Sequence, residues 1–131
     1  MSSRESLSGE TGSAVAEFTL VATLLTLLAL AVVQLALALH IRNTVLDAAA
    51  EGARYAALAD NGLSDGVGRT RDLITIALGG TYATGIAARY GDFGGHPSVE
   101  MRVVAPLPLF GLVGPNRGLE VVGHAAVETV G

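Results

Sequence analysis

A single carboxylate, Glu17, stands at the start of a long apolar run, where a charged side chain is costly. The cost is on the order of 2–3 kcal/mol at the middle of a membrane and less at its edge. Gly12 lies five residues earlier, at the end of a polar segment, Met1 to Gly12, that is rich in Ser and Gly and is expected to be disordered. Each feature has an ordinary explanation, because Ser13 can cap a helix and Glu17 can be a first-turn acid favoured by the helix dipole. Their occurrence together needs a further reason.

Elsewhere, titratable and nucleophilic side chains do not gather at catalytic or metal-binding spacing. His40, His96 and His124 share no ligand spacing. Ser64 and Asp65 lie in a Gly-rich stretch typical of turns, and no phosphate-binding Lys follows, because the chain contains no Lys. The absence of Cys excludes disulfides, thiolate metal sites and thiol catalysis. We therefore expect no enzymatic activity, no metal site and no cofactor.

Composition limits the remaining classes of function. The formal net charge is −4, and no basic cluster could neutralise a row of phosphates, so nucleic-acid binding is not expected. Half of the 131 residues are hydrophobic, yet only 5% are aromatic. This mixture suits a long helix better than a large aromatic core, and the length allows one small domain.

The apolar run, Phe18 to Leu39, contains 22 residues without a charge, a Gly or a Pro. As a helix it would measure roughly 33 Å, close to the thickness of the hydrocarbon core. A cleaved secretory signal is the main alternative, because Ala36-Leu37-Ala38 resembles a small-residue cleavage site. The run is longer than a usual signal core and has only Arg4 before it, which favours a transmembrane helix.

The helix is predicted to continue beyond the membrane. Residues 40–60 contain strong helix formers and no Pro, and Asp60-Asn61-Gly62 is a stop signal. A second face carries Glu51 with Arg54 as an i,i+3 pair, together with Asp47 and Leu58. Apolar and small residues recur at spacings of three and four on one face: Ile41, Val45, Ala48, Gly52, Ala56 and Ala59.

The rest of the chain, residues 61–131, is predicted to form a small head. Gly62–Gly68 is expected to be a loop, and Arg69–Leu78 a short helix with Leu73, Ile76 and Ala77 on its apolar side. Thr81–Pro97 is irregular, although Thr84–Tyr90 fits a helical turn or a strand. Val99–Ala105 and Leu119–Val130 alternate as half-buried strands and should pair antiparallel under the extended helix. The fold class is therefore α+β.

The arrangement around Gly12 resembles the signal of type IV pilins and pseudopilins. In those proteins a polar leader ends in Gly, Glu is the fifth mature residue, and about twenty apolar residues follow. The resemblance implies that residues 1–12 are a cytoplasmic leader and that a prepilin peptidase cuts between Gly12 and Ser13. Residues 13–39 would form the transmembrane half of the helix. Glu17, followed by Phe18, would pair with the new amino terminus of a neighbour and set the assembly register.

A second segment is similar to the Tad branch of that superfamily. Asp47 to Ala57, with Glu51-Gly52-Ala53-Arg54 at its centre, looks like the helix motif that follows the membrane span in TadE-like proteins. The apolar Pro106-Leu107-Pro108-Leu109-Phe110 loop and the terminal strand are also similar. The resemblance implies a minor pilin or pseudopilin with other pilins, an inner-membrane assembly platform and the lipid bilayer as partners.

Small and hydroxyl side chains form one stripe in the span: Ala16, Thr19, Thr23, Thr26 and Ala29. Such a stripe favours close packing of helices in lipid. The alternative is that each Thr hydroxyl bonds back to its own helix.

Two other functions remain open. The chain could be an uncleaved, signal-anchored envelope protein that binds a partner through its head, or a head released near Ala38. Arg4 alone precedes the span, whereas Arg42 and Arg54 follow it, so the positive-inside count opposes a cytoplasmic amino terminus. We give the leader motif more weight and expect the head to be extracytoplasmic.

Overall fold

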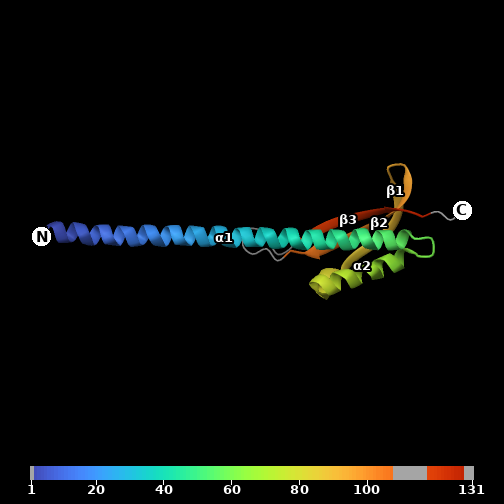
Figure 1. Ribbon diagram of the computed structural model, residues 1–131, viewed down its shortest axis with the longest axis horizontal. Coiled ribbons are helices and arrows are strands. Elements are labelled where there is room, and N and C mark those ends of the chain that lie inside the picture. Colours follow the sequence, from blue (N-terminus) through green and yellow to red (C-terminus); the bar gives the residue numbers. More distant parts are fainter. Residues whose placement is uncertain (1, 108–117, 129–131) are drawn as a thin grey trace. The chain divides into compact units, whose positions relative to one another are not determined.

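The computed structural model describes residues 2–107 and 118–128. The order of elements is α1 (Ser2–Ala57), α2 (Leu63–Leu78), the 3-10 helix η1 (Gly80–Ala83), β1 (Gly85–Phe93), β2 (His96–Pro106) and β3 (Gly118–Ala126) (Figure 1). The chain divides into two compact units, residues 1–36 and residues 37–131. The first unit consists of the amino-terminal part of α1, and the second contains the rest of α1 and all other elements. The predicted α+β class is confirmed.

Helix α1 begins earlier than the sequence suggested. The leader was expected to lack regular structure, but α1 starts at Ser2. This expectation was wrong because no Pro interrupts the leader, and extending an existing helix requires no new nucleus. The helix ends at Ala57, near the predicted stop, where the Asn61 side-chain amide donates to the Tyr55 carbonyl at 2.9 Å. The Glu128 amide donates to the Ala57 carbonyl at 2.8 Å.

The predicted small-residue face of residues 41–56 forms much of the core in the second unit. All of its members are buried except Ala59, which lies beyond the end of the helix. A neighbouring row, Ala49, Ala53 and Ala57, is also buried. Because most of these side chains are Ala or Gly, the helix backbone can lie close to the sheet and to α2.

Helix α2 is longer than predicted, and the face that it buries differs from the predicted one. It starts at Leu63, so the expected Gly62–Gly68 loop is wrong, and it ends where Gly79-Gly80 was predicted to end it. Gly66, Thr70 and Ile74 form its buried face. Leu73 is half-buried, whereas Ile76 is 84% exposed and Ala77 is exposed. The predicted apolar side of α2 therefore did not include the residues that face the core, which are a Gly, a Thr and an Ile.

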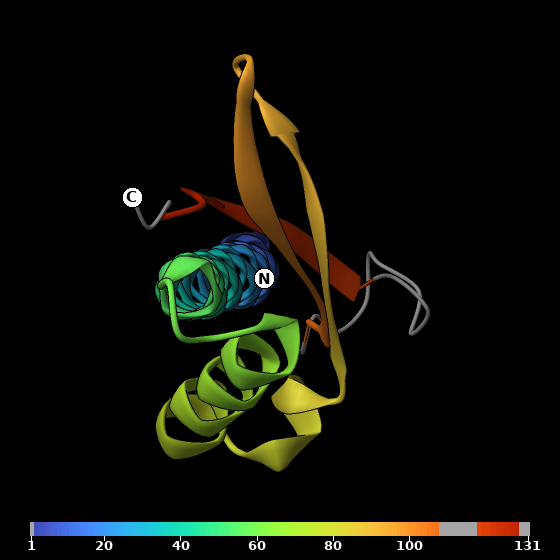
Figure 2. The same cartoon turned by 90° about the vertical axis from the view of Figure 1, so that its right-hand side faces the viewer.

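The sheet has three antiparallel strands in the order β1-β2-β3, rather than the two predicted. The predicted pair is confirmed as β2 and β3, with Val103 opposite Val121. The additional strand, β1, forms a hairpin with β2 through Gly94 and Gly95, which both have positive φ angles of 62° and 84°. Two successive positive angles favour glycine in a two-residue hairpin turn. In Figure 2 the turn of this hairpin projects away from α1 and α2.

One face of the sheet is buried under α1 and α2. Val99, Met101 and Val103 on β2 are completely buried, and they join Ile74 and the apolar face of α1 in a single core. A Cβ atom added at Gly123 on β3 would lie 2.7 Å from the Ala49 carbonyl carbon. The backbone of β3 therefore contacts α1 directly, as predicted for the helix that covers the strands.

Candidate assembly and processing site

The predicted processing site lies within a regular helix. Gly12, Ser13 and Glu17 are all exposed, and an added Cβ at Gly12 would meet nothing within 4 Å. In an α-helix the N–H of residue 13 donates to the carbonyl of residue 9, and the carbonyl of residue 12 accepts from residue 16. Both sides of the Gly12–Ser13 bond are therefore engaged in the hydrogen bonds of α1.

The apolar segment after Glu17 is exposed within its own unit. Phe18 is 74% exposed, and the large apolar side chains from Leu20 to Leu35 are each more than half exposed. One helix in the described residues, Gly9–Ala57, is long and apolar enough to cross a membrane. An exposed apolar surface of this extent requires lipid or other helices to cover it.

The threonines of the predicted packing stripe use their hydroxyl groups within the helix. The Thr19, Thr23 and Thr26 side chains donate to the carbonyls four residues earlier at 2.8, 2.7 and 2.8 Å. The two interpretations of the stripe remain compatible, since a satisfied hydroxyl can still line a helix contact. With Ala16 and Ala29, these residues would then offer a small, satisfied surface rather than free donors to a neighbour.

The residues of the segment similar to the TadE-like motif lie in two different environments, the core and the surface. Gly52 and Ala53 are buried in the core. Glu51 is half-buried and Arg54 is exposed, and their side chains form the predicted i,i+3 ion pair at 4.0 Å. The motif thus contributes packing through its small residues and a charged surface through the other two.

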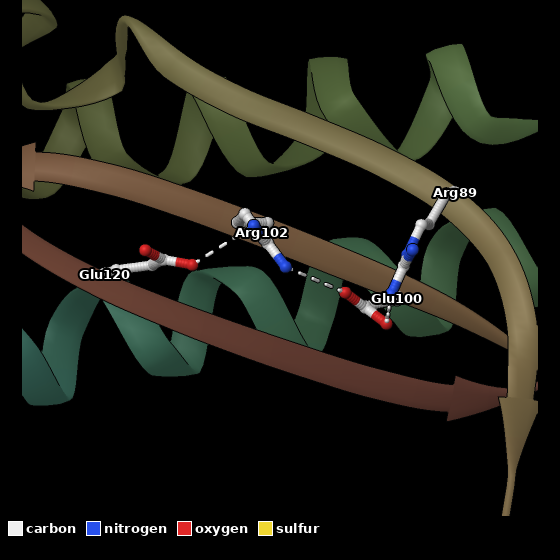
Figure 3. Close-up of polar contacts among 4 residues, drawn as sticks. All are labelled: Arg89, Glu100, Arg102 and Glu120. Atoms are coloured by element: carbon white, nitrogen blue, oxygen red, sulfur yellow. Dashed lines mark hydrogen bonds and ion pairs between the residues drawn. The ribbon is translucent and has the colours of Figure 1, made fainter.

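A row of alternating charges crosses the other face of the sheet (Figure 3). Arg89 on β1 donates to Glu100 on β2 at 2.9 Å, and Arg102 lies 3.6 Å from Glu100 and 3.3 Å from Glu120 on β3. The hydrogen bond from Arg89 holds the pKa of the Glu100 carboxyl below its ordinary value, and the same bond raises the pKa of Arg89. The row joins all three strands.

Sequence reasoning missed this row because it depends on strand register. Arg89 is opposite Glu100, and Glu120 is opposite Val104, two pairs along from Arg102. The alternating charges at Glu100 and Arg102 were visible in the sequence. Arg89 could be paired with them only by recognising β1, and Glu120 only from the register of β2 and β3. At the hairpin end of the same face, the Phe93 ring stacks on His124 with centroids 4.5 Å apart.

The three histidines do not form one cluster. His40, His96 and His124 are exposed on α1, β2 and β3 respectively. His96 and His124 line one open hollow at the sheet together with Phe93 and Ser98, and His40 is not part of its lining. Across residues 2–107 and 118–128, no group of three or more His, Asp or Glu side chains could hold a metal ion. Of the predicted apolar loop, Pro106 ends β2 and Leu107 packs against the core, whereas Pro108, Leu109 and Phe110 lie outside the described residues.

These features define a small α+β head that follows an amino-terminal helix able to span a membrane. Residues 12–54 match the family model described as TadE-like protein. The match confirms the predicted resemblance and supports the interpretation of the chain as a TadE-like protein. The matched segment begins at Gly12, includes Glu17 and ends at Arg54. No curated protein and no solved structure matches the chain.

Proposed function

We propose that this chain is a pseudopilin or minor pilin of a Tad-type pilus or secretion assembly. The observation that carries the proposal is the match over residues 12–54, which joins the apolar helix, Glu17 at its edge and the Glu51 to Arg54 segment. The apolar surface of the helix supports it, because α1 must be covered by lipid before assembly and by other helices afterwards.

Maturation would create the charge pair that assembly needs. A prepilin peptidase hydrolyses the Gly12–Ser13 bond, adding one water and leaving a carboxylate on Gly12 and an ammonium group on Ser13. When the helix leaves the lipid headgroups to pack against neighbours, Glu17 of one subunit pairs with this ammonium group of another. Each charge then offsets the other's desolvation, and the pairing is satisfied at one axial offset only.

The role is structural rather than enzymatic. Part of the charge of the head is arranged in ion pairs across the sheet and along α1, which contribute to a stable, soluble surface. Its partners are the peptidase, the other pilins of the assembly and the inner-membrane platform. The head would lie outside the cytoplasm, with the leader in the cytoplasm.

The test is the location of the protein in matched strains with and without an active prepilin peptidase. A tagged full-length chain should appear in the sheared surface fraction only when the peptidase is active, and in the membrane fraction otherwise. The second candidate is an uncleaved, signal-anchored envelope protein that binds a partner through its head. It would remain in the membrane fraction of both strains, and that result would contradict the proposal.

A further inference from the structure

The bond proposed for cleavage lies in a helical turn whose two glycines contact no other element. Helix α1 runs without interruption from Ser2 through Gly12 and Ser13. A Cβ added at Gly9 or Gly12 would meet nothing within 4 Å. At these two positions the stability of the turn therefore depends on backbone hydrogen bonds and on the helix propensity of the residue present.

A helical bond is a poor substrate for hydrolysis. The Ser13 N–H is directed at the Gly9 carbonyl, and the Gly12 carbonyl is directed at the Ala16 N–H. A peptidase must bring water to the Gly12 carbonyl and later protonate the Ser13 nitrogen, so both hydrogen bonds have to open. Cleavage of a folded segment follows the population of its open form when opening is fast relative to cleavage.

We propose that Gly9, the hydrogen-bond partner of the scissile Ser13 amide, is a positioning residue that lets the turn from residue 9 to residue 13 unwind for the peptidase. The inference rests on the proposed function, since it concerns the same bond. Gly is the poorest helix former apart from Pro. Gly9 occupies the position whose carbonyl accepts the hydrogen bond from the Ser13 N–H, and this bond closes the helical turn that contains the scissile bond. Gly12 flanks the bond itself and must also meet the peptidase, so Gly9 is the better position for a test.

The inference predicts an order of cleavage rates for two Gly9 variants that the size of the new side chain alone would not produce. Ala is the best helix former, so Gly9→Ala should slow cleavage by about fivefold, the factor that corresponds to the difference in helix propensity. Thr is larger than Ala but a much poorer helix former, so Gly9→Thr should be cut less than twofold more slowly than the wild type, by about the same propensity scale. If the peptidase simply required a small residue at this position, Thr would be the slower of the two.

The experiment uses the full-length chain and the prepilin peptidase in detergent micelles, with the peptidase in excess over an equal concentration of each variant. Single-turnover cleavage rates are measured together with hydrogen exchange of the Ser13 amide in the absence of peptidase. The expected result is that Gly9→Ala slows both exchange and cleavage by about the same factor, while Gly9→Thr changes both by less than twofold.

Any other order of the two variants overturns the inference, as does a change in cleavage without a change in exchange. A wild-type chain that is not cut at all would instead contradict the proposed function. Cleavage of all three chains at one rate would leave the proposed function intact and remove the role assigned to Gly9.

Discussion

At the scale of single residues, the chain places its charges in two different settings. Glu100 lies between Arg89 and Arg102 on the sheet, where ion pairs surround it in the folded head. Glu17 is exposed at the start of the apolar segment, and no ion pair involves it within the described residues. The first charge thus stabilises the fold of the chain itself, whereas the second is available for the pairing with a neighbouring subunit that we propose.

The Glu100 carboxylate should make head stability depend on pH. Because its pKa is lower in the folded chain than the ordinary 4.5, ionised Glu100 stabilises the head above that value, and this contribution is lost as the pH falls through the folded pKa. Glu100→Gln should therefore destabilise the head at neutral pH and much less at about pH 3.

Urea unfolding followed by tyrosine emission can check this, because Tyr55, Tyr82 and Tyr90 all belong to the second unit. The exposed Glu128 provides a matched control as Glu128→Gln. Equal destabilisation by Glu100→Gln at both pH values would show that the carboxylate charge is not what Arg89 and Arg102 require.

The Glu17 carboxylate should act in assembly rather than in maturation. Glu17→Gln keeps the size of the side chain and removes the charge, so the chain should still be cut after Gly12. Its amount in the sheared pilus fraction should fall by about tenfold or more, because the Ser13 ammonium group of the neighbour would be buried without an anion. Wild-type incorporation of the cleaved variant would remove Glu17 from the assembly mechanism.

At the scale of elements, α1 and α2 contact each other in the head at glycines, which have no side chains to keep the two backbones apart. A Cβ at Gly66 would lie 2.6 Å from the Gly52 carbonyl oxygen, and a Cβ at Gly52 would lie 2.8 Å from the Gly66 carbonyl oxygen. The two backbones meet at these positions. Thr70, next to this contact, is completely buried and satisfies its hydroxyl on the Gly66 carbonyl at 2.9 Å.

This contact predicts opposite effects for two glycines of the same helix. Gly66→Ala should lower the free energy of unfolding of the head by about 1–3 kcal/mol, because the added methyl group forces the helices apart. Gly68→Ala should raise it by up to about 1 kcal/mol, since an added Cβ meets nothing within 4 Å and Ala is the better helix former. Urea unfolding of both variants measures the difference. A stabilising Gly66→Ala would show that α1 and α2 do not meet there.

How far the elements could be predicted depended on whether their signal was local. The alternation of Val99, Met101 and Val103 identified β2 because one face is buried throughout. Thr84–Tyr90, most of which lies in strand β1, was left open between a helical turn and a strand because Gly85, Ala87, Ala88 and Gly91 dilute its strand formers. The start of α2 was taken for a loop because Gly66 and Gly68 suggest a turn, whereas Gly66 is required by a helix contact that only the tertiary structure shows.

The site followed the same rule. Gly12, Glu17 and the threonine stripe could be found from spacing along one helix, because an α-helix converts sequence distance into position. The charge row from Arg89 to Glu120 could not, since it requires the register of three strands. The helical state of the leader was also missed, because its Ser and Gly residues favour a flexible segment when the continuous helix behind them is ignored.

At the scale of the whole molecule, the proposed function gives different roles to a membrane-competent helix and a compact head. The head has its own core, whereas the apolar surface of residues 18–35 is exposed and remains to be covered. Lipid can cover that surface before assembly, and neighbouring helices can cover it afterwards. Small residues on the covered face then determine how closely the helices approach.

The stripe of Thr19, Thr23 and Thr26 should therefore lie in the subunit interface. Replacing all three with Leu keeps the helix apolar but fills the small face, so the amount of pilus-incorporated protein should fall while membrane insertion is unchanged. Leu24, Leu28 and Leu35, replaced together by Ile, provide a control of equal number in the same segment. Unchanged incorporation of the triple Leu variant would place the interface on another face.

The central claim is that this helix is released from its leader in order to assemble, and the mass of the native protein tests it most directly. Intact-mass spectrometry of the chain purified from its own membrane and pilus fractions should give a polypeptide that starts at Ser13. A polypeptide starting at Met1 or Ser2 in both fractions would identify a permanent anchor, and one starting near His40 would identify a released head. Either of these results would contradict the account.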